Sequence, residues 1–350
     1  MVAITRSAFL KATAATALTG LLAACTTGSN DTSSSSTSSA ASGESYTVKH
    51  AFGETTFTAV PQKIAVVNFW KNPDVLLALG VVPAGTPVVT YGANANGSTD
   101  WFDAKLAELG GTAPVTYDET DGPDYEALAT LAPDAIFSVY GDMTQEVYDK
   151  LTAIAPVVAM PEGVGAYAAS WEDVINQAAA MLQKDDEGAA LIEATNKTID
   201  DAAAKYSNLA GKTFVAGMFD LEAQTLSAYV ASDSRSQFLT SLGMELAPYI
   251  EQNATEADAF FMTISGEVLP EVQSDLVWAW GTSDSDEEAI KSNTLFSQMP
   301  AVANGGLVVE TDAAISLALS AASPLSLDWA INQTETLAKL SAAIDASQAS

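Results

Sequence analysis

A long helical stretch in the middle of the chain decides the fold, and it reads 171-WEDVINQAAAMLQKDDEGAALIEATNKTIDDAAAKYSN-208. Its second part keeps apolar or small residues at helical spacing over 191–206, while the 184–186 charge cluster and Gly188 predict a break before it. About 22 residues of helix span roughly 33 Å. Because that length is long for a single crossover between strands, the stretch is predicted to be a rigid bridge between two lobes.

Short β-rich runs alternate with helical segments on both sides of this bridge. Before it, we predict strands at 64–69, 81–85, 134–139 and 156–159, and helices at 74–79, 102–109, 124–131 and 145–154. After it, we predict strands at 213–218, 225–230, 276–280 and 307–310, and helices at 236–242 and 326–344. This alternation predicts an α/β fold with two lobes of mainly parallel sheet joined by one long α-helix. The expected boundaries are an N-terminal lobe at 46–170, linker helices at 171–208 and a C-terminal lobe at 209–350.

The composition excludes several classes of function. The 350 residues carry 14 Lys and Arg against 44 Asp and Glu, for a formal net charge of −30. Binding to nucleic acid needs a basic surface, which this chain lacks. His50 is the one histidine and Cys25 the one cysteine, so clustered-His metal sites and His-assisted nucleophilic catalysis are not expected. We expect neither an enzyme nor a cofactor.

The N-terminus is typical of an exported lipoprotein. Arg6 and Lys11 precede an apolar and small-residue run that ends at Cys25, which predicts a signal peptide at 1–24. The Leu-Ala-Ala-Cys ending resembles the lipobox of bacterial lipoproteins, in which the cysteine is lipidated, for example with palmitate. Residues 25–45, mostly Ser and Thr, are then a flexible tether. The protein is therefore expected outside the cytoplasm, anchored to the cell membrane through Cys25.

Aromatic side chains cluster where the predicted strands end, which is where ligands bind in open α/β sheets. The candidate ligand-binding aromatics are Trp70, Tyr91, Trp101, Tyr140, Trp171, Tyr229 and Trp280. Each one alone is as readily explained by core packing; Trp278 and Trp280 point to the same face, for example. Arg235 completes the set. It either contacts an anionic ligand oxygen or an aromatic ring, or it pairs with one of the many acids. Lys71 is the other well-placed cation.

From Tyr46 to the C-terminus the chain resembles the siderophore- and cobalamin-type substrate-binding proteins of ATP-driven (ABC) importers, most closely the iron–siderophore lipoproteins of actinobacteria. The phrases that carry the resemblance are VPQKIAVV (60–67), LALGVVPAG (77–85), YEALA (125–129), LAPDAI (131–136), IAPVV (154–158), SRSQFL (234–239), LGM (242–244) and MPAV (299–302). The resemblance implies the class III periplasmic-binding-protein fold with a helical backbone. It also implies a monomer that captures a ferric siderophore and delivers it to a membrane permease with its ATPase.

The family also implies a docking role for one glutamate on each lobe, at Glu126 and Glu267 here. The chain departs from relatives that place several basic residues against tri-catecholate complexes. We therefore favour a neutral or cationic ferric hydroxamate, with the iron held by the siderophore. Cobalamin or another large solute is the alternative ligand, while haem is disfavoured because His50 lies outside the cleft-forming segments. The acids Asp118, Glu119, Asp121 and Asp124 leave a secreted glycoside hydrolase as an unfavoured alternative.

Overall fold

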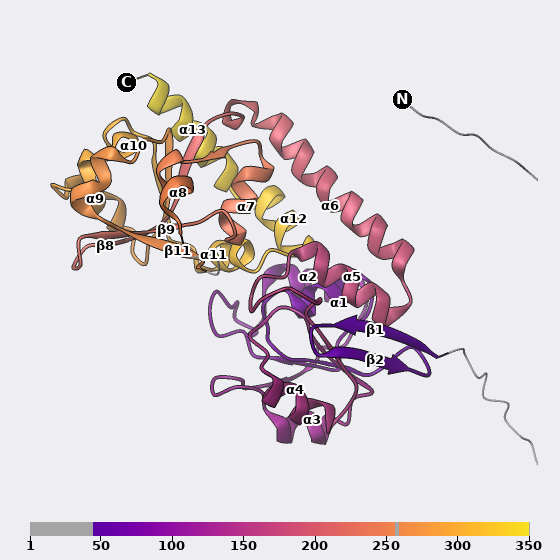
Figure 1. Cartoon of the computed structure of the whole chain (residues 1–350). Coiled ribbons are helices and arrows are strands. Elements are labelled where there is room, and N and C mark those ends of the chain that lie inside the picture. The colour runs from indigo at the N-terminus through magenta and orange to yellow at the C-terminus, as the bar shows by residue number, and fades with distance from the viewer. Residues whose placement is uncertain (1–44, 256–258, 350) are drawn as a thin grey trace, which may run out of the picture. The chain divides into compact units, whose positions relative to one another are not determined.

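The computed structural model describes residues 45–255 and 259–349 (Figure 1). The predicted signal peptide, Cys25 and the tether as far as residue 44 lie outside the described residues. The described residues lie in one compact unit built around two separate α/β sheets. We refer to the first sheet with its helices as the N-terminal lobe and to the second as the C-terminal lobe.

The N-terminal lobe holds a five-stranded sheet in which every pairing is parallel. In spatial order its strands are β5 (Val115–Tyr117), β4 (Gly85–Pro87), β3 (Ile64–Val66), β6 (Ala135–Ser138) and β7 (Val157–Ala159). The accompanying helices are α1 (Asn72–Ala78), α2 (Asp100–Glu108), α3 (Tyr125–Leu131) and α4 (Gln145–Thr152). In β3, Ile64 and Val66 pack into one core and Ala65 into another. This sheet is therefore buried on both faces, as its continuous apolar runs predict.

An antiparallel hairpin, β1 (Tyr46–His50) and β2 (Gly53–Phe57), covers the β7 edge of this sheet. The hairpin was not predicted from the sequence. Thr55 Oγ1 donates to the carbonyl of Val157 at 2.5 Å, and the ring of the buried His50 shares a 3.0 Å hydrogen bond with Thr55 Oγ1. His50 therefore has a structural role at this edge of the sheet.

The C-terminal lobe has a mixed sheet. Its strands are β8 (Thr213–Asp220), β9 (Thr225–Tyr229), β10 (Glu245–Leu246), β11 (Phe261–Ser265), β12 (Leu276–Trp280) and β13 (Leu307–Glu310). β10, β8, β12 and β13 pair in parallel, whereas β9 pairs antiparallel with both β8 and β11. The β8–β9 pair arises because Asp220 accepts from the N–H groups of Glu222 and Ala223, which turns the chain straight back after β8.

The helices and short 3₁₀ turns of the C-terminal lobe complete its core. They are η1 (Ser207–Leu209), α7 (Ser234–Ser241), α8 (Pro248–Asn253), η2 (Gly266–Glu271), α9 (Asp286–Ser292), η3 (Phe296–Gln298), α10 (Pro300–Ala303), α11 (Ala313–Ser320), α12 (Pro324–Asn332) and α13 (Thr336–Gln348). The predicted single helix over 326–344 is wrong, because Thr334 interrupts it. Its hydroxyl donates to the carbonyl of Ala330 and accepts from the N–H of Thr336, in place of backbone hydrogen bonds.

The predicted bridge is present as two helices, α5 (Trp171–Leu182) and α6 (Asp185–Lys205). A capping box starts α5, since Ser170 and Asp173 each accept the other's backbone N–H at 3.0 Å. The break falls at Gln183, whose φ is 54°, so Gly188 lies inside α6. A Cβ on Gly188 would meet the Cβ of Ala179 at 2.7 Å, which explains why glycine allows the two helices to pack closely. The 21 residues of α6 span about 32 Å.

The sequence placed one strand of the N-terminal sheet wrongly. The strand predicted at 81–85 is β4 at Gly85–Pro87. Pro83 has no N–H to donate to a neighbouring strand, and pairing begins only where Ala84 donates to the carbonyl of Ile64. Strands β5, β10 and β11 were also not predicted, whereas the other predicted strands are present. The α/β, two-lobed fold class is confirmed.

Candidate functional site

A cavity of about 900 Å³ lies where strands of both sheets end. From the N-terminal lobe it is lined by Trp70, Tyr91, Tyr140 and Tyr167. From the C-terminal lobe it is lined by Met218, Phe219, Asp220, Leu221, Ser227, Tyr229, Ser232, Asp233, Ser234, Arg235, Phe260, Phe261, Trp280, Ser316 and Ser320. We call this space the main cavity. Aromatic faces around a small number of polar groups suit a large, partly apolar ligand.

The structure brings six of the eight predicted ligand-binding residues to this cavity. They are Trp70, Tyr91, Tyr140, Tyr229, Arg235 and Trp280. Trp101 and Trp171 lie elsewhere. Trp171 begins α5 and lines a separate cavity of about 170 Å³, packed against the cores of both lobes. Both of these tryptophans lie in the first turn of a helix and not at the end of a strand.

Trp101 has a structural role between the lobes. Its indole N–H donates to Asp74 Oδ2 at 2.7 Å, and the same oxygen accepts from Ser323 Oγ of the C-terminal lobe at 2.7 Å. Its ring also packs on Trp329 of α12, with ring centroids 5.2 Å apart. Asp74 is 4% exposed, and burial raises the pKa of its carboxyl to about 7, although both hydrogen bonds act to lower it. One buried carboxyl therefore ties α1 to the segment before α12.

The raised pKa of Asp74 predicts a pH-dependent stability. Between about pH 4 and pH 7 the folded protein holds a proton on Asp74 that the unfolded chain has released, so the stability from this group falls as pH rises through that window. The Asp74→Asn variant cannot ionise there. From pH 4 to pH 7 the free energy of unfolding of wild type should therefore fall relative to that of the variant, by a few kcal/mol. Urea unfolding of both proteins at the two pH values measures this, and a constant difference would contradict it.

Arg235 is held in place by a buried carboxylate. Its Nε and Nη2 donate to the two oxygens of Asp233 at 2.8 and 2.7 Å, while its backbone N–H donates to Asp233 Oδ1 at 2.9 Å. Asp233 is the N-cap of α7 and is 5% exposed. The guanidinium also lies 3.4 Å from the centre of the Tyr229 ring. Both roles considered from the sequence therefore occur together, with a buried acid as partner and not a surface one.

This pairing fixes the electrostatics of the site. Burial acts to lower the pKa of Arg235, but the hydrogen bonds and charge of Asp233 outweigh it and raise the pKa. The two opposite charges offset each other, so the pair presents oriented N–H donors with little net charge. Of the described residues that line the main cavity, Arg235 is the one with a cationic side chain.

Lys71 is not presented to the main cavity. Its side chain is buried, its Nζ lies 4.0 Å from the centre of the Tyr140 ring, and it donates to the carbonyl of Ala169 at 3.4 Å. Burial lowers the pKa of Lys71 to about 8, against the opposing effect of Glu172 and Asp233. Lys71 therefore supports Tyr140 from behind instead of meeting a ligand.

Tyr140 of the N-terminal lobe and Tyr229 of the C-terminal lobe remain neutral phenols at physiological pH. Burial raises the pKa of both Tyr140 and Tyr229 to about 12. The nearby charge of Asp233 acts in the same direction on both of these tyrosines. Both rings can therefore offer a hydroxyl and an apolar face to a bound molecule.

Sequence reasoning did not select several lining residues. Tyr167, whose φ is 53°, packs edge-on against Tyr140. The rim carries unusually exposed apolar side chains, with Met218 42% and Phe261 49% exposed, next to Tyr91 at 49%. In the sequence these rim residues look like ordinary apolar residues of strands and loops. Only the three-dimensional structure shows that they surround one opening.

The remaining candidate residues lie on the surface. Glu126 and Glu267 are both exposed, each in the first turn of a short helical segment, α3 and η2 respectively. The acids at 118–124 mostly have local roles: Asp118 accepts from Thr120, Asp124 caps α3, and Glu119 accepts from the N–H of Asn68. Burial raises the pKa of the Glu119 carboxyl to about 7.

Within residues 45–255 and 259–349, no group of three or more His, Cys, Asp or Glu side chains is arranged to hold a metal ion. No helix in the same part of the chain has the length and apolar character required to cross a membrane.

The fold and the aromatic cavity between two lobes define an extracytoplasmic type of solute-binding protein. The chain belongs to the periplasmic binding protein family, whose profile matches residues 65–314. Its sequence is 29% identical over 276 residues to the probable siderophore-binding lipoprotein YfiY of Bacillus subtilis, covering 76% of this chain and 80% of that protein.

Solved structures give the same result. PiaA of Streptococcus pneumoniae in complex with ferrichrome matches with a TM-score of 0.76 and 31% identity, over 86% of this chain and 99% of that one. A second structure, described as the iron uptake ABC transporter substrate-binding protein PiaA, matches with a TM-score of 0.74 and 29% identity, over 86% and 100% of the two chains. Members of this family are binding proteins.

Proposed function

We propose that this protein is the extracytoplasmic receptor of an ABC importer and captures a ferric siderophore in the main cavity. The observation that carries the proposal is the cavity itself, with about 900 Å³ enclosed by aromatic rings from both lobes around one Asp233–Arg235 pair. The similarity to a siderophore-binding lipoprotein and to a ferrichrome-bound structure supports the same class of ligand.

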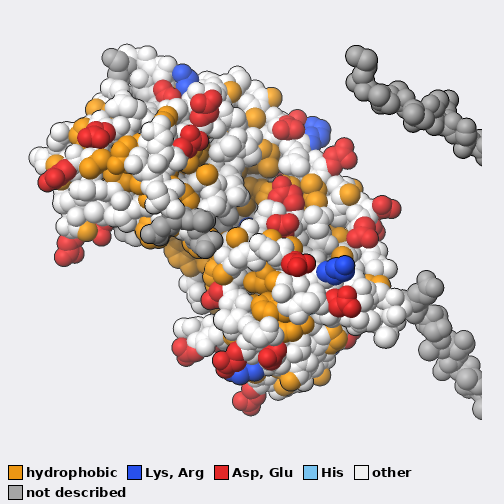
Figure 2. All heavy atoms as spheres, in the orientation of Figure 1, with side chains coloured by type: hydrophobic (Ala, Val, Ile, Leu, Met, Phe, Trp, Pro, Cys, Tyr) orange, Lys and Arg blue, Asp and Glu red, His pale blue; other side chains and the backbone are white. Residues whose placement is uncertain are grey.

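The charge distribution favours a neutral or cationic ferric hydroxamate over a catecholate. A ferric tri-catecholate is highly anionic, and Arg235 already has Asp233 as its partner. Acidic side chains are spread across the visible face with few basic ones among them (Figure 2), in line with the net charge of −30. This field repels an anion and leaves a neutral complex unaffected. The iron would be held by the oxygens of the siderophore, so the protein itself needs no metal ligand, cofactor or catalytic group.

Two exposed glutamates and the N-terminal segment would serve delivery of the ligand to the permease. Glu126 and Glu267 offer one exposed carboxylate on each lobe for a basic permease surface, where charge complementarity sets orientation and association rate. Lipidated Cys25 would anchor a monomeric receptor to the cell membrane next to the permease and its ATPase, with residues 25–45 as tether, ahead of the lobes at 46–170 and 209–350 and their linker at 171–208.

Tryptophan-fluorescence titration of the protein tests the proposed ligand class. Trp70 and Trp280 line the main cavity, so a bound ferric complex should quench their emission. We expect saturable quenching by ferrichrome, a neutral ferric hydroxamate, and none by iron-free ferrichrome. A ferric tri-catecholate should bind at least tenfold more weakly. Tighter binding of the catecholate would overturn the charge argument, and binding of cobalamin but of no ferric complex would overturn the proposed function.

A further inference from the structure

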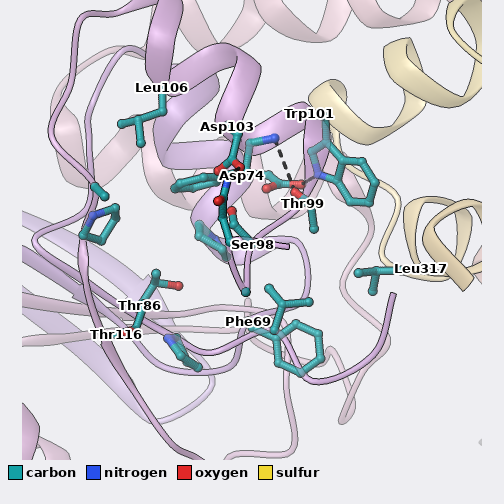
Figure 3. Close-up of a pocket in the computed structure, with 18 of the residues that line it drawn as sticks. Phe69, Asp74, Thr86, Ser98, Thr99, Trp101, Asp103, Leu106, Thr116 and Leu317 are labelled. Atoms are coloured by element: carbon teal, nitrogen blue, oxygen red, sulfur yellow. Dashed lines mark hydrogen bonds between the residues drawn. The ribbon is translucent and has the colours of Figure 1, made fainter. Parts of the chain in front are cut away.

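A second cavity, of about 550 Å³, lies beside the main one (Figure 3). We call it the side cavity. It is lined by α1, by β4 with the loop that follows, by α2 and by α11. Its walls are mostly apolar and include Phe69, Trp101, Leu106 and Leu317. An apolar space of this size suits an alkyl chain or a ring.

The side cavity also has an unsatisfied polar group. Thr86 is 8% exposed, and its hydroxyl has no hydrogen-bond partner among the described residues. A buried hydroxyl without a partner carries a free-energy cost that a bound polar atom would remove. The buried carboxyl of Asp74 lines the same space. The cavity can therefore take an apolar group that carries one hydrogen-bonding atom, such as an amide.

The two cavities share a wall. Trp70 lines both of them, with its ring stacked on Phe69 at a centroid distance of 5.0 Å. On α11, Ser316 and Ser320 line the main cavity, whereas Leu317 and the residue that ends the helix, Ala321, line the side cavity. A ligand in the main cavity therefore lies next to the side cavity, with Trp70 between them.

We infer that the side cavity binds an apolar arm of the same ligand, so that the preferred ligand is an acylated ferric hydroxamate. This inference rests on the proposed function. The core of the complex occupies the main cavity, and its acyl chain passes Trp70 into the space beneath α2. An amide at the start of the chain meets the Thr86 hydroxyl. The exposed apolar side chains around the main cavity, such as Tyr91 and Phe261, favour the same amphiphilic type of ligand.

The test compares two neutral ligands that differ only in chain length, the N-acetyl and N-octanoyl derivatives of ferrioxamine, a linear ferric trihydroxamate. Wild type should bind the octanoyl derivative at least tenfold more tightly, because burial of two methylenes already accounts for about that factor. Ala107→Trp places a large ring at an exposed position of α2 that lines the side cavity and not the main one. It should leave the affinity for the acetyl derivative unchanged and remove the octanoyl advantage.

Ala104→Trp is the matched control, since Ala104 is exposed on the same helix and lines neither cavity. It should keep the octanoyl advantage of wild type. An octanoyl derivative that binds no better than the acetyl derivative, or an advantage that survives Ala107→Trp, would overturn the inference while leaving the proposed function intact. If wild type binds ferrichrome but neither derivative, the inference alone is overturned; if it binds neither ferrichrome nor the derivatives, the proposed function is overturned and the inference with it.

Discussion

Replacing Arg235 with alanine is expected to weaken binding of ferrichrome by about 10- to 150-fold. The side chain is only 16% exposed and is fixed by Asp233 and by the Tyr229 ring, so its remaining N–H groups are already oriented toward the cavity. A hydrogen bond from a charged donor contributes about 1.5–3 kcal/mol, which converts to that range of affinity. Fluorescence titration of wild type and variant measures the change.

The same substitution leaves Asp233 buried without its partner, which by itself destabilises the fold. A second variant separates the two effects. In Asp233→Asn/Arg235→Met the buried charge is absent, so the free energy of unfolding should recover toward wild type while ferrichrome binding stays weak. Lys197→Ala, at an exposed position of α6, is the control for loss of a positive charge and should bind like wild type. Full affinity in the double variant would remove Arg235 from the binding site.

Replacing Trp278 with alanine is expected to lower the free energy of unfolding by about 3–5 kcal/mol, the range for a large aromatic deleted from a core. Trp278 is fully buried between the Phe238 ring and the Trp280 ring, which it meets edge-on at a centroid distance of 4.2 Å. It does not line the main cavity. Urea unfolding at constant pH measures the loss.

Trp280 is the matched comparison, two residues further along the same strand. Its ring lines the main cavity next to Tyr229, with centroids 6.5 Å apart. Trp280→Ala should weaken ferrichrome binding at least tenfold and lower stability by less than Trp278→Ala does. Trp278→Ala should bind ferrichrome within about threefold of wild type wherever it is folded. The opposite pattern would show that the two tryptophans have been assigned the wrong roles.

Trp278 and Trp280 illustrate which features of the site can be predicted from the sequence and which cannot. Their spacing in β12 places both rings on one face, which the sequence predicts. Which ring is core and which faces the cavity depends on where the strand ends relative to the other lobe. The position of the strand end relative to the other lobe is set by contacts between residues far apart in the sequence. No local sequence pattern therefore distinguishes the two tryptophans. The same holds for Trp101, whose partner Asp74 also accepts from Ser323.

The fold was easier to predict than the site because hydrophobic periodicity is local. The strand–helix alternation and the bridge at 171–208 predicted two α/β lobes. The hairpin β1–β2 and the strand β11 were not predicted, and β9 was predicted as a strand without its antiparallel pairing, because partner choice depends on turns and edges. In the site, Arg235 was identified by its rarity. Its partner Asp233 was not, although an acid two residues before an arginine at a helix start is a usable signal.

A crystal structure of the protein grown with ferrichrome would show where the ligand binds. We expect the iron complex in the main cavity, in contact with Trp70, Tyr140 and Trp280, with at least one siderophore oxygen accepting from Arg235. Ferrichrome bound outside this cavity, or inside it without any contact to Arg235, would disprove binding of a ferric hydroxamate against Arg235 and the aromatic rings of both lobes.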